Sequence, residues 1–490
     1  MTPEDVAPAC AIPSPAAPVN LVIFGGTGDL AVRKIFPALA SLCRSQLLSQ
    51  DSRIIAVGRK DLGRERYLNQ IMERLAGSIP SACLSDLQAR LDYLAMDPDV
   101  PGSAQVLAAH LARLDASGSR NRLYYLAVPP AAYIPLSRNL GQANLGAEAG
   151  GRSVRIVVEK PFGRDLHSAR ELDAVLHQYF EERQIFRIDH YMAKETVQNV
   201  LLLRFANALL EPLWNRRYID HIRITAAETL GIGHRAGFYD QTGVLRDMFQ
   251  NHMMMLLALC AMEPPSLFEA ELVRDERSKV FRALRPLDLS RLGEQLVLGQ
   301  YGPGLVEGQA VPGYLQEPGV RPDSSTPTFA WMKVFLDNWR WQGVPFHLCS
   351  GKRLAGKRTE ISVQFKRVPV SMFRNIHGDA IAPNRLILGI HPEEVVRMEV
   401  QTKGPGPQLC LRSQFMEFSY GAQSVLHRLD DYAKVLLDCI LGDQTLFWRQ
   451  DAVELCWGFL TPILDQCDCP DRAIPLHTYP AGGPGPKTDQ

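Results

Sequence analysis

Residues 21–39 read LVIFGGTGDLAVRKIFPAL, an apolar run followed at once by a glycine-rich turn and a helical pattern. Within this stretch, Gly26, Gly28 and Ala31 fit the pattern G-x-G-x-x-A, in which small residues let a pyrophosphate approach the backbone at a helix N-terminus. A turn that only joins a strand to a helix is the alternative, but this context favours dinucleotide binding. We therefore predict that the dinucleotide site includes the turn residues Gly25, Gly26, Thr27, Gly28, Asp29 and Leu30.

The same alternation of short apolar runs and helical patterns continues through the first half of the chain. The strands expected there are 20–24, 53–57, 122–128 and 153–159. This order predicts an α/β domain of the Rossmann type, with a doubly wound parallel sheet. Beyond about residue 200, long helical patterns mix with alternating runs, which predicts an α+β domain with a large, mainly antiparallel sheet. Its expected strands include 221–226, 359–365 and 395–401.

Composition shifts divide the chain into four expected segments. They are a disordered arm at 1–18, the Rossmann domain at 19–198, the α+β domain at 199–480 and a disordered tail at 481–490. The arm is rich in Pro and Ala, and the tail is rich in Gly and Pro. Residues 303–328 are also rich in Gly and Pro, which predicts a long surface loop.

Charge and cysteine content narrow the classes of partner. Lys plus Arg equals Asp plus Glu at 53 each in this chain of 490 residues, so no basic field favours nucleic acid or an anionic membrane. Cys467 and Cys469 lack the additional Cys or His ligands of a zinc site, and we predict no metal. The start has no cationic, apolar leader, and the longest apolar run, 253–262, is shorter than the roughly 20 residues of a membrane span. A cytoplasmic protein without a membrane partner is expected.

The end of the second expected strand indicates which dinucleotide is bound. A strand that ends on an acid favours a free ribose 2′-hydroxyl, and one that ends on Arg favours a 2′-phosphate. Here Arg59 and Lys60 follow the strand, which favours NADP. If the strand were shifted in register, Asp61 would lie near the ribose and NAD could also be used. Alternatively, Arg59 and Lys60 are solvated surface cations without a function.

Three further motifs carry polar residues. Residues 158–163, VEKPFG, set Lys160 at a strand end, where it would meet a ligand or extend to solvent. Residues 187–195, RIDHYMAKE, would place His190 and Lys194 one turn apart if helical, so that both could bind a phosphate with Tyr191 as a further donor. A solvated helix face is the alternative. Residues 243–252, GVLRDMFQNH, precede a buried helix, where a lone His is more often a core residue than a catalyst.

Together these motifs closely resemble the glucose-6-phosphate dehydrogenases, from about residue 19 to about residue 475. The segments that carry the resemblance are GGTGDLA at 25–31, EKPFG at 159–163, RIDHYMAKE at 187–195, RDMFQNH at 246–252 and GVPFHLCSGK at 343–352. The resemblance implies oxidation of glucose 6-phosphate to 6-phosphoglucono-lactone with hydride transfer to NADP, the first oxidative step of the pentose phosphate pathway. It also implies a homodimer or homotetramer, with the second domain binding substrate and forming the dimer interface.

The resemblance also assigns roles residue by residue. It implies that His252 is the general base and that Asp189, far away in the sequence, orients the His252 imidazole. The phosphate would be bound by His190, Tyr191 and Lys194, and the sugar or its phosphate by Glu228, Asp247, Lys352 and Lys357. On the cofactor side, the matching residues are Arg59 at the 2′-phosphate, Lys160 between cofactor and substrate, and Tyr133 and Lys34.

The sequence shows three departures from the family pattern and leaves two rival functions open. Met192 and Ala193 replace the family's Leu and Gly. Gly389 stands where animal members have an Arg associated with a second, structural cofactor, so we expect no second cofactor site, and His391 leaves a substrate contact open. One rival is a sugar oxidoreductase of the glucose–fructose or inositol dehydrogenase kind, which needs no phosphate site. The other is an inactive NADP-sensing protein, which the presence of both Asp189 and His252 disfavours.

Overall fold

The computed structural model describes residues 15–116, 118, 120–373, 381–419, 429–468 and 474–488. The chain forms two compact units. The first comprises Met1–Phe162, Arg170–Ala193 and Leu426–Trp448, and the second comprises Gly163–Ala169, Lys194–Val425 and Arg449–Gln490.

The first unit is built on a six-stranded parallel sheet in the order β3-β2-β1-β4-β5-β6. The strands are β1 Val19–Phe24, β2 Arg53–Gly58, β3 Leu91–Ala95, β4 Asn121–Leu126, β5 Val154–Val158 and β6 Ile185–Arg187. All six residues of β1 are buried, as expected for a parallel sheet covered on both faces. The predicted Rossmann-type sheet is confirmed, and its order is the one in which dinucleotides bind at the carboxyl ends of the strands.

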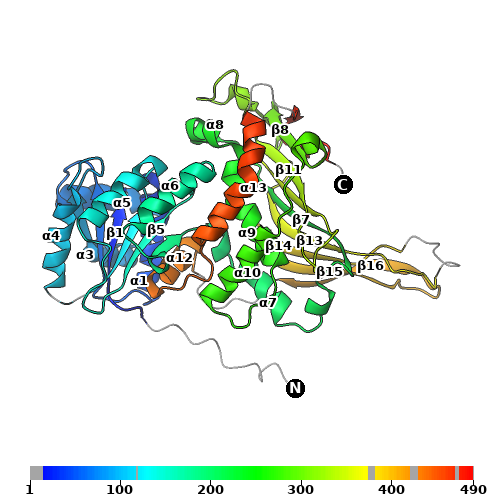
Figure 1. Cartoon of the computed structure of the whole chain (residues 1–490), viewed down its shortest axis with the longest axis horizontal. Helices are drawn as coiled ribbons and strands as arrows, with labels where there is room; N and C mark the ends of the chain where they lie inside the picture. Colours follow the sequence, from blue (N-terminus) through cyan, green and yellow to red (C-terminus); the bar gives the residue numbers. More distant parts are fainter. Residues whose placement is uncertain are drawn as a thin grey trace. The chain divides into compact units, whose positions relative to one another are not determined.

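Helices enclose this sheet (Figure 1). They include α1 Phe36–Arg44, α2 Arg64–Leu75, α3 Ser81–Arg90, α4 Ala104–Asp115, α5 Tyr133–Gln142, α6 Leu166–His177 and α12 Asp431–Leu441. Helix α12 comes from the far end of the sequence, yet Leu436 and Ile440 are buried in the same core as Leu39 of α1. The expected boundary at 198/199 assigned this helix to the second domain, and the structure corrects that assignment because its apolar face completes the first core.

The second unit contains a nine-stranded sheet in the order β16-β15-β14-β13-β7-β12-β11-β8-β17. The strands are β7 Ile219–Ala227, β8 Leu296–Gly302, β11 Phe329–Val334, β12 Phe346–Gly351, β13 Arg358–Phe365, β14 Arg385–His391, β15 Val395–Lys403, β16 Leu411–Ser419 and β17 Leu476–Pro480. All neighbours are antiparallel except β7 with β12 and β8 with β17. The predicted, mainly antiparallel sheet is confirmed.

Helices of the second unit pack beside this sheet, and α10 lies against both α9 and α13 (Figure 1). The helices are α7 Glu195–Phe205, α8 Ala236–Val244, α9 Met254–Ala261, α10 Ala270–Arg282 and α13 Gln450–Asp468. Every residue of α9 is buried, so this apolar run is the central helix of the core. No helix in the described part of the chain is long and apolar enough to cross a membrane.

The expected surface loop at 303–328 contains short regular elements, and part of the expected disordered tail is packed. Residues 303–328 contain a hairpin of β9 Gly304–Val306 and β10 Gln309–Val311, and the buried Tyr314 donates to Asp240 at 2.9 Å. In the tail, the Ala481 amide donates to the Gly302 carbonyl oxygen at 3.1 Å. Both corrections have one cause: Gly and Pro permit close backbone packing as well as loops. Of the expected arm, residues 15–18 are described and Ala16 is buried; residues 1–14 and 489–490 lie outside the described residues.

Candidate active site

The glycine-rich turn leaves β1 directly above its neighbour β2. The amides of Gly25 and Gly26 both donate to the Val57 carbonyl oxygen at 3.0 Å. Gly25 has a φ of 82°, and a Cβ there would lie 2.2 Å from the Ala127 oxygen. A Cβ on Gly26 would lie 2.6 Å from that of Ala56. The turn therefore requires glycine at both positions.

A helical segment begins at residue 29, within reach of this turn. The first N–H groups of a helix have no acceptor within it, so the amides near Asp29 and Leu30 are not used by the helix itself. Two side chains of α2 bond the turn: the Tyr67 hydroxyl donates to the Gly26 oxygen at 2.8 Å, and Arg74 donates to the Thr27 oxygen at 3.0 Å. These two hydrogen bonds hold the backbone of the turn in position.

Arg59 and Lys60 follow β2 and are both exposed. Among the described residues, none forms a hydrogen bond or ion pair with the Arg59 guanidinium. Asp61 also lies on the surface, but its Oδ1 accepts from the Gly63 amide at 3.3 Å and so stabilises the local turn. Arg59 therefore lies exposed at the carboxyl end of β2, the strand that pairs with β1.

The predicted strand end at Glu159 and Lys160 is organised by two tyrosines. Tyr125 donates its hydroxyl to Glu159 Oε1 at 2.6 Å, and Tyr133 donates to the Glu159 main-chain oxygen at 3.0 Å. Burial raises the pKa of the Glu159 carboxyl. Tyr133, predicted on the cofactor side, is itself buried, so its hydroxyl positions the segment that carries Lys160.

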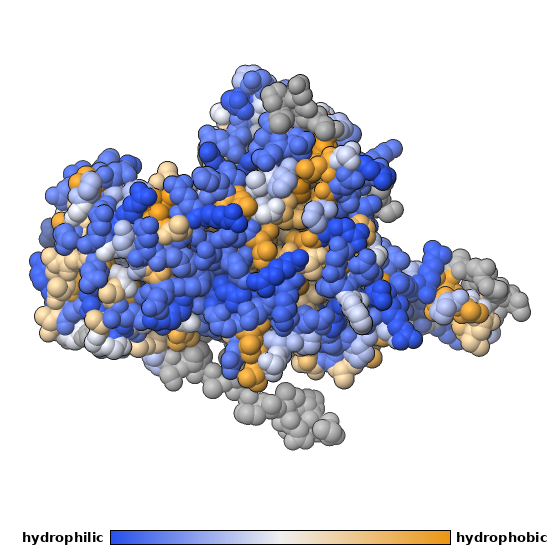
Figure 2. Space-filling view, in the orientation of Figure 1, coloured by the Kyte–Doolittle hydropathy of each residue, from blue (hydrophilic) through white to orange (hydrophobic). Residues whose placement is uncertain are grey.

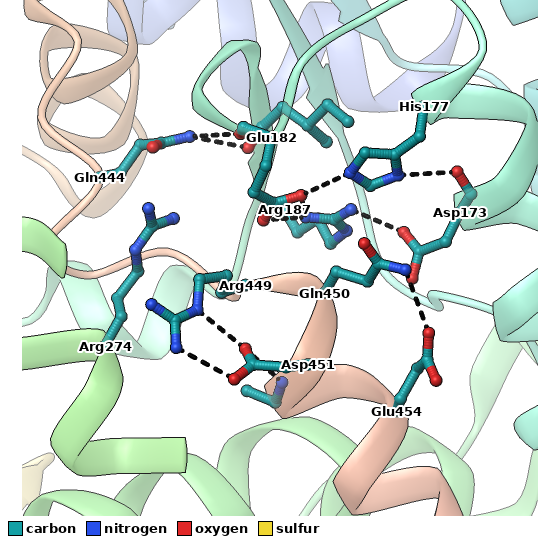
Figure 3. Close-up of polar contacts among 12 residues, drawn as sticks. Asp173, His177, Glu182, Arg187, Arg274, Gln444, Arg449, Gln450, Asp451 and Glu454 are labelled. Atoms are coloured by element: carbon teal, nitrogen blue, oxygen red, sulfur yellow. Dashed lines mark hydrogen bonds and ion pairs between the residues drawn. The ribbon is translucent and has the colours of Figure 1, made fainter.

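The motif that begins at Arg187 is anchored by a buried ion pair (Figure 3). Arg187 contacts Asp173 at 2.6 Å and Glu182 at 2.8 Å, and both Arg187 and Asp173 are almost fully buried. Burial raises the pKa of the Asp173 carboxyl even though Arg187 favours its charged form. The His177 imidazole donates to the Glu182 carboxylate at 3.1 Å, a contact that raises the His177 pKa. These contacts fix the end of β6 just before Asp189.

The next residues form a compact polar cluster in the first unit. The Tyr191 amide donates to Asp189 Oδ1 at 3.0 Å, and the His190 and Tyr191 rings lie 5.2 Å apart. His190 also stacks on Tyr432 of α12, at 6.1 Å and 16°. Lys34 Nζ lies 5.9 Å from the centre of the Tyr432 ring. Tyr432 is therefore a residue of this cluster that no motif in the sequence indicated.

The segment 187–195 is not one continuous helix. His190–Ala193 forms a single 3-10 turn (η5), and Lys194 has the extended angles φ −65° and ψ 129° before α7 begins at Glu195. The conditional expectation of a helical spacing between His190 and Lys194 is therefore wrong. The break coincides with the boundary of the first unit, which falls between Ala193 and Lys194.

His252 lies in a π-helix, Leu245–Met253 (η8), of the second unit. Its exposed fraction is 1%, and Asp247 is 7% exposed. Wide π-turns are rare and occur often at functional sites. Arg246 anchors this turn by donating to the Arg164 carbonyl oxygen at 2.9 Å and to Asp468 at 2.7 Å.

Glu228 and Lys352 meet at the ends of the parallel strands β7 and β12. The Lys352 ammonium forms a short ion pair with Glu228, and the Glu228 amide donates to the Gly351 oxygen at 2.9 Å. The structure thus joins two of the predicted sugar-binding residues. Lys357 is exposed just before β13, and in the described part of the chain no hydrogen bond or ion pair links it to that pair. At Gly389 in β14 a Cβ would lie 2.5 Å from the Glu393 oxygen, so the strand has no space for a larger residue at this position.

The chain is similar to known proteins along nearly its whole length. Residues 22–199 match the family model "Glucose-6-phosphate dehydrogenase, NAD binding domain", and residues 201–490 match the model of the C-terminal domain of the same family. A glucose-6-phosphate 1-dehydrogenase of Mycolicibacterium smegmatis is 45% identical over 480 residues, covering 97% of this chain and 95% of the relative. One from Treponema pallidum is 42% identical over 479 residues, covering 96% and 92%.

Solved structures agree with these relatives. A glucose-6-phosphate dehydrogenase in complex with its substrate glucose 6-phosphate superposes with a TM-score of 0.88 at 33% identity, covering 97% of this chain and 96% of that one. The enzyme from Mycobacterium avium superposes with a TM-score of 0.81 at 36% identity, covering 96% of each chain. The chain belongs to the glucose-6-phosphate dehydrogenase family.

Proposed function

We propose that this protein oxidises glucose 6-phosphate to 6-phosphoglucono-lactone with NADP, using His252 as the general base. The observation that carries the proposal is the match to full-length glucose-6-phosphate 1-dehydrogenases through both units of the chain. Family membership makes the protein an oxidoreductase with a nicotinamide cofactor, acting in the first oxidative step of the pentose phosphate pathway. The choice of NADP and the roles of individual residues are our proposals.

The residues at the end of β1 fit a nicotinamide dinucleotide. Only glycine is accommodated at Gly25 and Gly26, and a Cβ on Gly28 would meet nothing nearer than the Gly25 oxygen at 3.0 Å. The backbone from Gly25 to Leu30 would hold the pyrophosphate, with Arg59 and Lys34 as the cations nearby. When bound, the cofactor supplies the acceptor for the hydride.

Each polar group has a distinct task in this mechanism. His190, Tyr191 and Lys194 bind the phosphate, while Glu228, Asp247, Lys352 and Lys357 bind the sugar or its phosphate, and this positioning supplies much of the catalysis. His252 accepts the proton of the anomeric hydroxyl as the C–H bond at the same carbon breaks. Asp189 holds the His252 imidazole in the tautomer that can accept this proton. Lys160 lies between substrate and cofactor.

The preference for NADP is tested at Arg59. Arg59→Ala removes the guanidinium expected at the 2′-phosphate, so the KM for NADP is expected to rise about tenfold or more, with little change for NAD. Initial rates with each cofactor measure this effect. Lys60→Ala is the matched control, because it removes the adjacent exposed cation. An Arg59→Ala variant that keeps the wild-type KM for NADP would refute the 2′-phosphate role.

We infer that β16 forms a homodimer interface. Within the described part of the chain it is the edge strand of its sheet, and Phe415, Met416 and Phe418 are 53%, 64% and 43% exposed. Because successive side chains point to opposite faces, both faces of this strand present apolar surface. Figure 2 shows apolar surface beside charged residues on the projecting β15–β16 hairpin.

The proposed interface is tested by the mass of the protein in solution. Met416→Glu with Phe418→Glu is expected to shift sedimentation from a dimer to a monomer, because two charges would have to lose water in the contact. Gln414→Glu, a charge on the same strand at an already polar position, is the control. A wild-type chain that sediments as a monomer would overturn the inference, and a tetramer that the double variant splits into dimers would assign β16 to the contact between dimers.

A further inference from the structure

Tyr239 lies on α8 and is 1% exposed. Its ring is 6.3 Å from the Tyr314 ring, at an interplanar angle of 63°. The Lys352 ammonium lies 5.2 Å from the centre of the Tyr239 ring. Tyr239 therefore joins the aromatic core of the second unit to the Glu228–Lys352 ion pair.

The hydroxyl of Tyr239 is buried, and no donor or acceptor in the described part of the chain bonds it. Burying a hydroxyl without a partner is unfavourable, and a phenyl ring would fill the same space without that cost. Neighbouring tyrosines of the same core all have partners: Tyr301 donates to Glu317 at 3.0 Å, Tyr314 to Asp240 at 2.9 Å and Tyr479 to the Lys352 main-chain oxygen at 2.6 Å. The unpaired hydroxyl of Tyr239 is thus an exception that packing does not explain.

The charged groups around Tyr239 are residues proposed for the sugar site. Burial, together with the carboxylates of Asp247 and Glu228, raises the Tyr239 pKa well above its ordinary value. The hydroxyl therefore keeps its proton and is available as a donor. Glu228 keeps 34% of its side chain exposed and Lys352 only 3%, so a ligand would reach this position from the Glu228 side.

We propose that Tyr239 is a further substrate-binding residue, whose hydroxyl donates a hydrogen bond to a ring hydroxyl of the bound sugar. This inference rests on the proposed function of Glu228, Asp247 and Lys352 as sugar-binding residues. Glu228 and Lys352 carry long, flexible side chains that turn from each other toward the sugar when it binds. The same movement uncovers the Tyr239 hydroxyl and supplies its missing partner.

The Tyr239→Phe variant tests this contact because it removes only the hydroxyl oxygen. The KM for glucose 6-phosphate is expected to rise about tenfold, with kcat changed by less than about threefold, because the site loses one hydrogen bond to the substrate. The thermal midpoint is expected to stay the same or rise, since the ring remains and an unpaired buried group is gone. Tyr314→Phe is the matched control: it loses the bond to Asp240, so its thermal midpoint should fall while KM stays unchanged.

Substrate analogues identify the sugar hydroxyl that is bound. The 2-deoxy, 3-deoxy and 4-deoxy forms of glucose 6-phosphate are assayed with wild type and Tyr239→Phe. On the analogue that lacks the contacted hydroxyl, the two enzymes should have equal KM values. On the other analogues, the variant should have a higher KM than wild type.

Other results separate the inference from the proposed function. The substrate contact alone is overturned if Tyr239→Phe keeps the wild-type KM. It is also overturned if the variant raises KM equally on every analogue and has a lower thermal midpoint. A wild-type enzyme that does not oxidise glucose 6-phosphate overturns the proposed function itself.

Discussion

Replacing His252 with asparagine is expected to lower kcat for glucose 6-phosphate oxidation about a hundredfold or more, with little change in KM. Asparagine is smaller but remains polar at this buried position, and it cannot accept the proton of the anomeric hydroxyl. Removing an interaction that is made only in the transition state lowers kcat and leaves KM nearly unchanged. Steady-state rates at saturating cofactor measure both parameters.

A control variant and a double variant test this role of His252 further. His221→Asn is the matched control, because His221 lies near the opposite end of β7 from Glu228 and interacts with the exposed Asp220. Asp189→Asn should also lower kcat, and the double variant His252→Asn with Asp189→Asn should be no slower than His252→Asn alone, because an orienting carboxylate has no function without its base. An unchanged turnover number in His252→Asn would remove His252 from the mechanism.

Arg187→Met is expected to destabilise the protein by about 3 to 5 kcal/mol, the range for breaking a buried ion pair from one side. The guanidinium is 2% exposed, and without it the Asp173 carboxylate would be buried without its ion-pair partner. Activity should fall as well, since Arg187 fixes the strand end that leads to Asp189 and His190. Thermal and denaturant unfolding of wild type and variant measure the loss.

The companion variant Arg187→Met with Asp173→Leu removes both charges. It should recover much of the lost stability, because no unpaired charge remains in the core. Arg183→Met is the surface control: its ion pairs with Glu148 and Glu181 are solvent-exposed, and their loss should cost less than about 1 kcal/mol. If Arg187→Met were no more destabilising than Arg183→Met, the buried pair would not anchor the motif.

Local patterns in the sequence predicted much of the fold. The strand at 20–24 is observed as β1 Val19–Phe24 and the strand at 359–365 as β13 Arg358–Phe365, because an apolar or alternating run between turn residues has few other stable conformations. The glycine-rich turn was equally clear, since Gly25 and Gly26 occupy positions that exclude a side chain. These signals depend only on residues close together in the chain.

Features that depend on distant contacts could not be predicted in this way. Helix α12 shows an ordinary amphipathic pattern, and nothing in that pattern indicates that it packs with α1 rather than with its sequence neighbours. The role of Tyr432 beside His190 follows from that packing. Likewise, Tyr239 resembles any core tyrosine until its hydroxyl is found without a partner. The residue roles came from the family resemblance, and they remain predictions.

The most direct test of the central claim compares NADP reduction with glucose 6-phosphate and with glucose. The proposed site contains several groups that bind a phosphate, and unphosphorylated glucose would leave them unpaired, so kcat/KM should favour glucose 6-phosphate by at least about a thousandfold. Lys194→Met should reduce this ratio, because it should lower kcat/KM for glucose 6-phosphate and leave kcat/KM for glucose unchanged. Equal kcat/KM values for the two sugars would contradict the account and favour a sugar oxidoreductase that does not recognise phosphate.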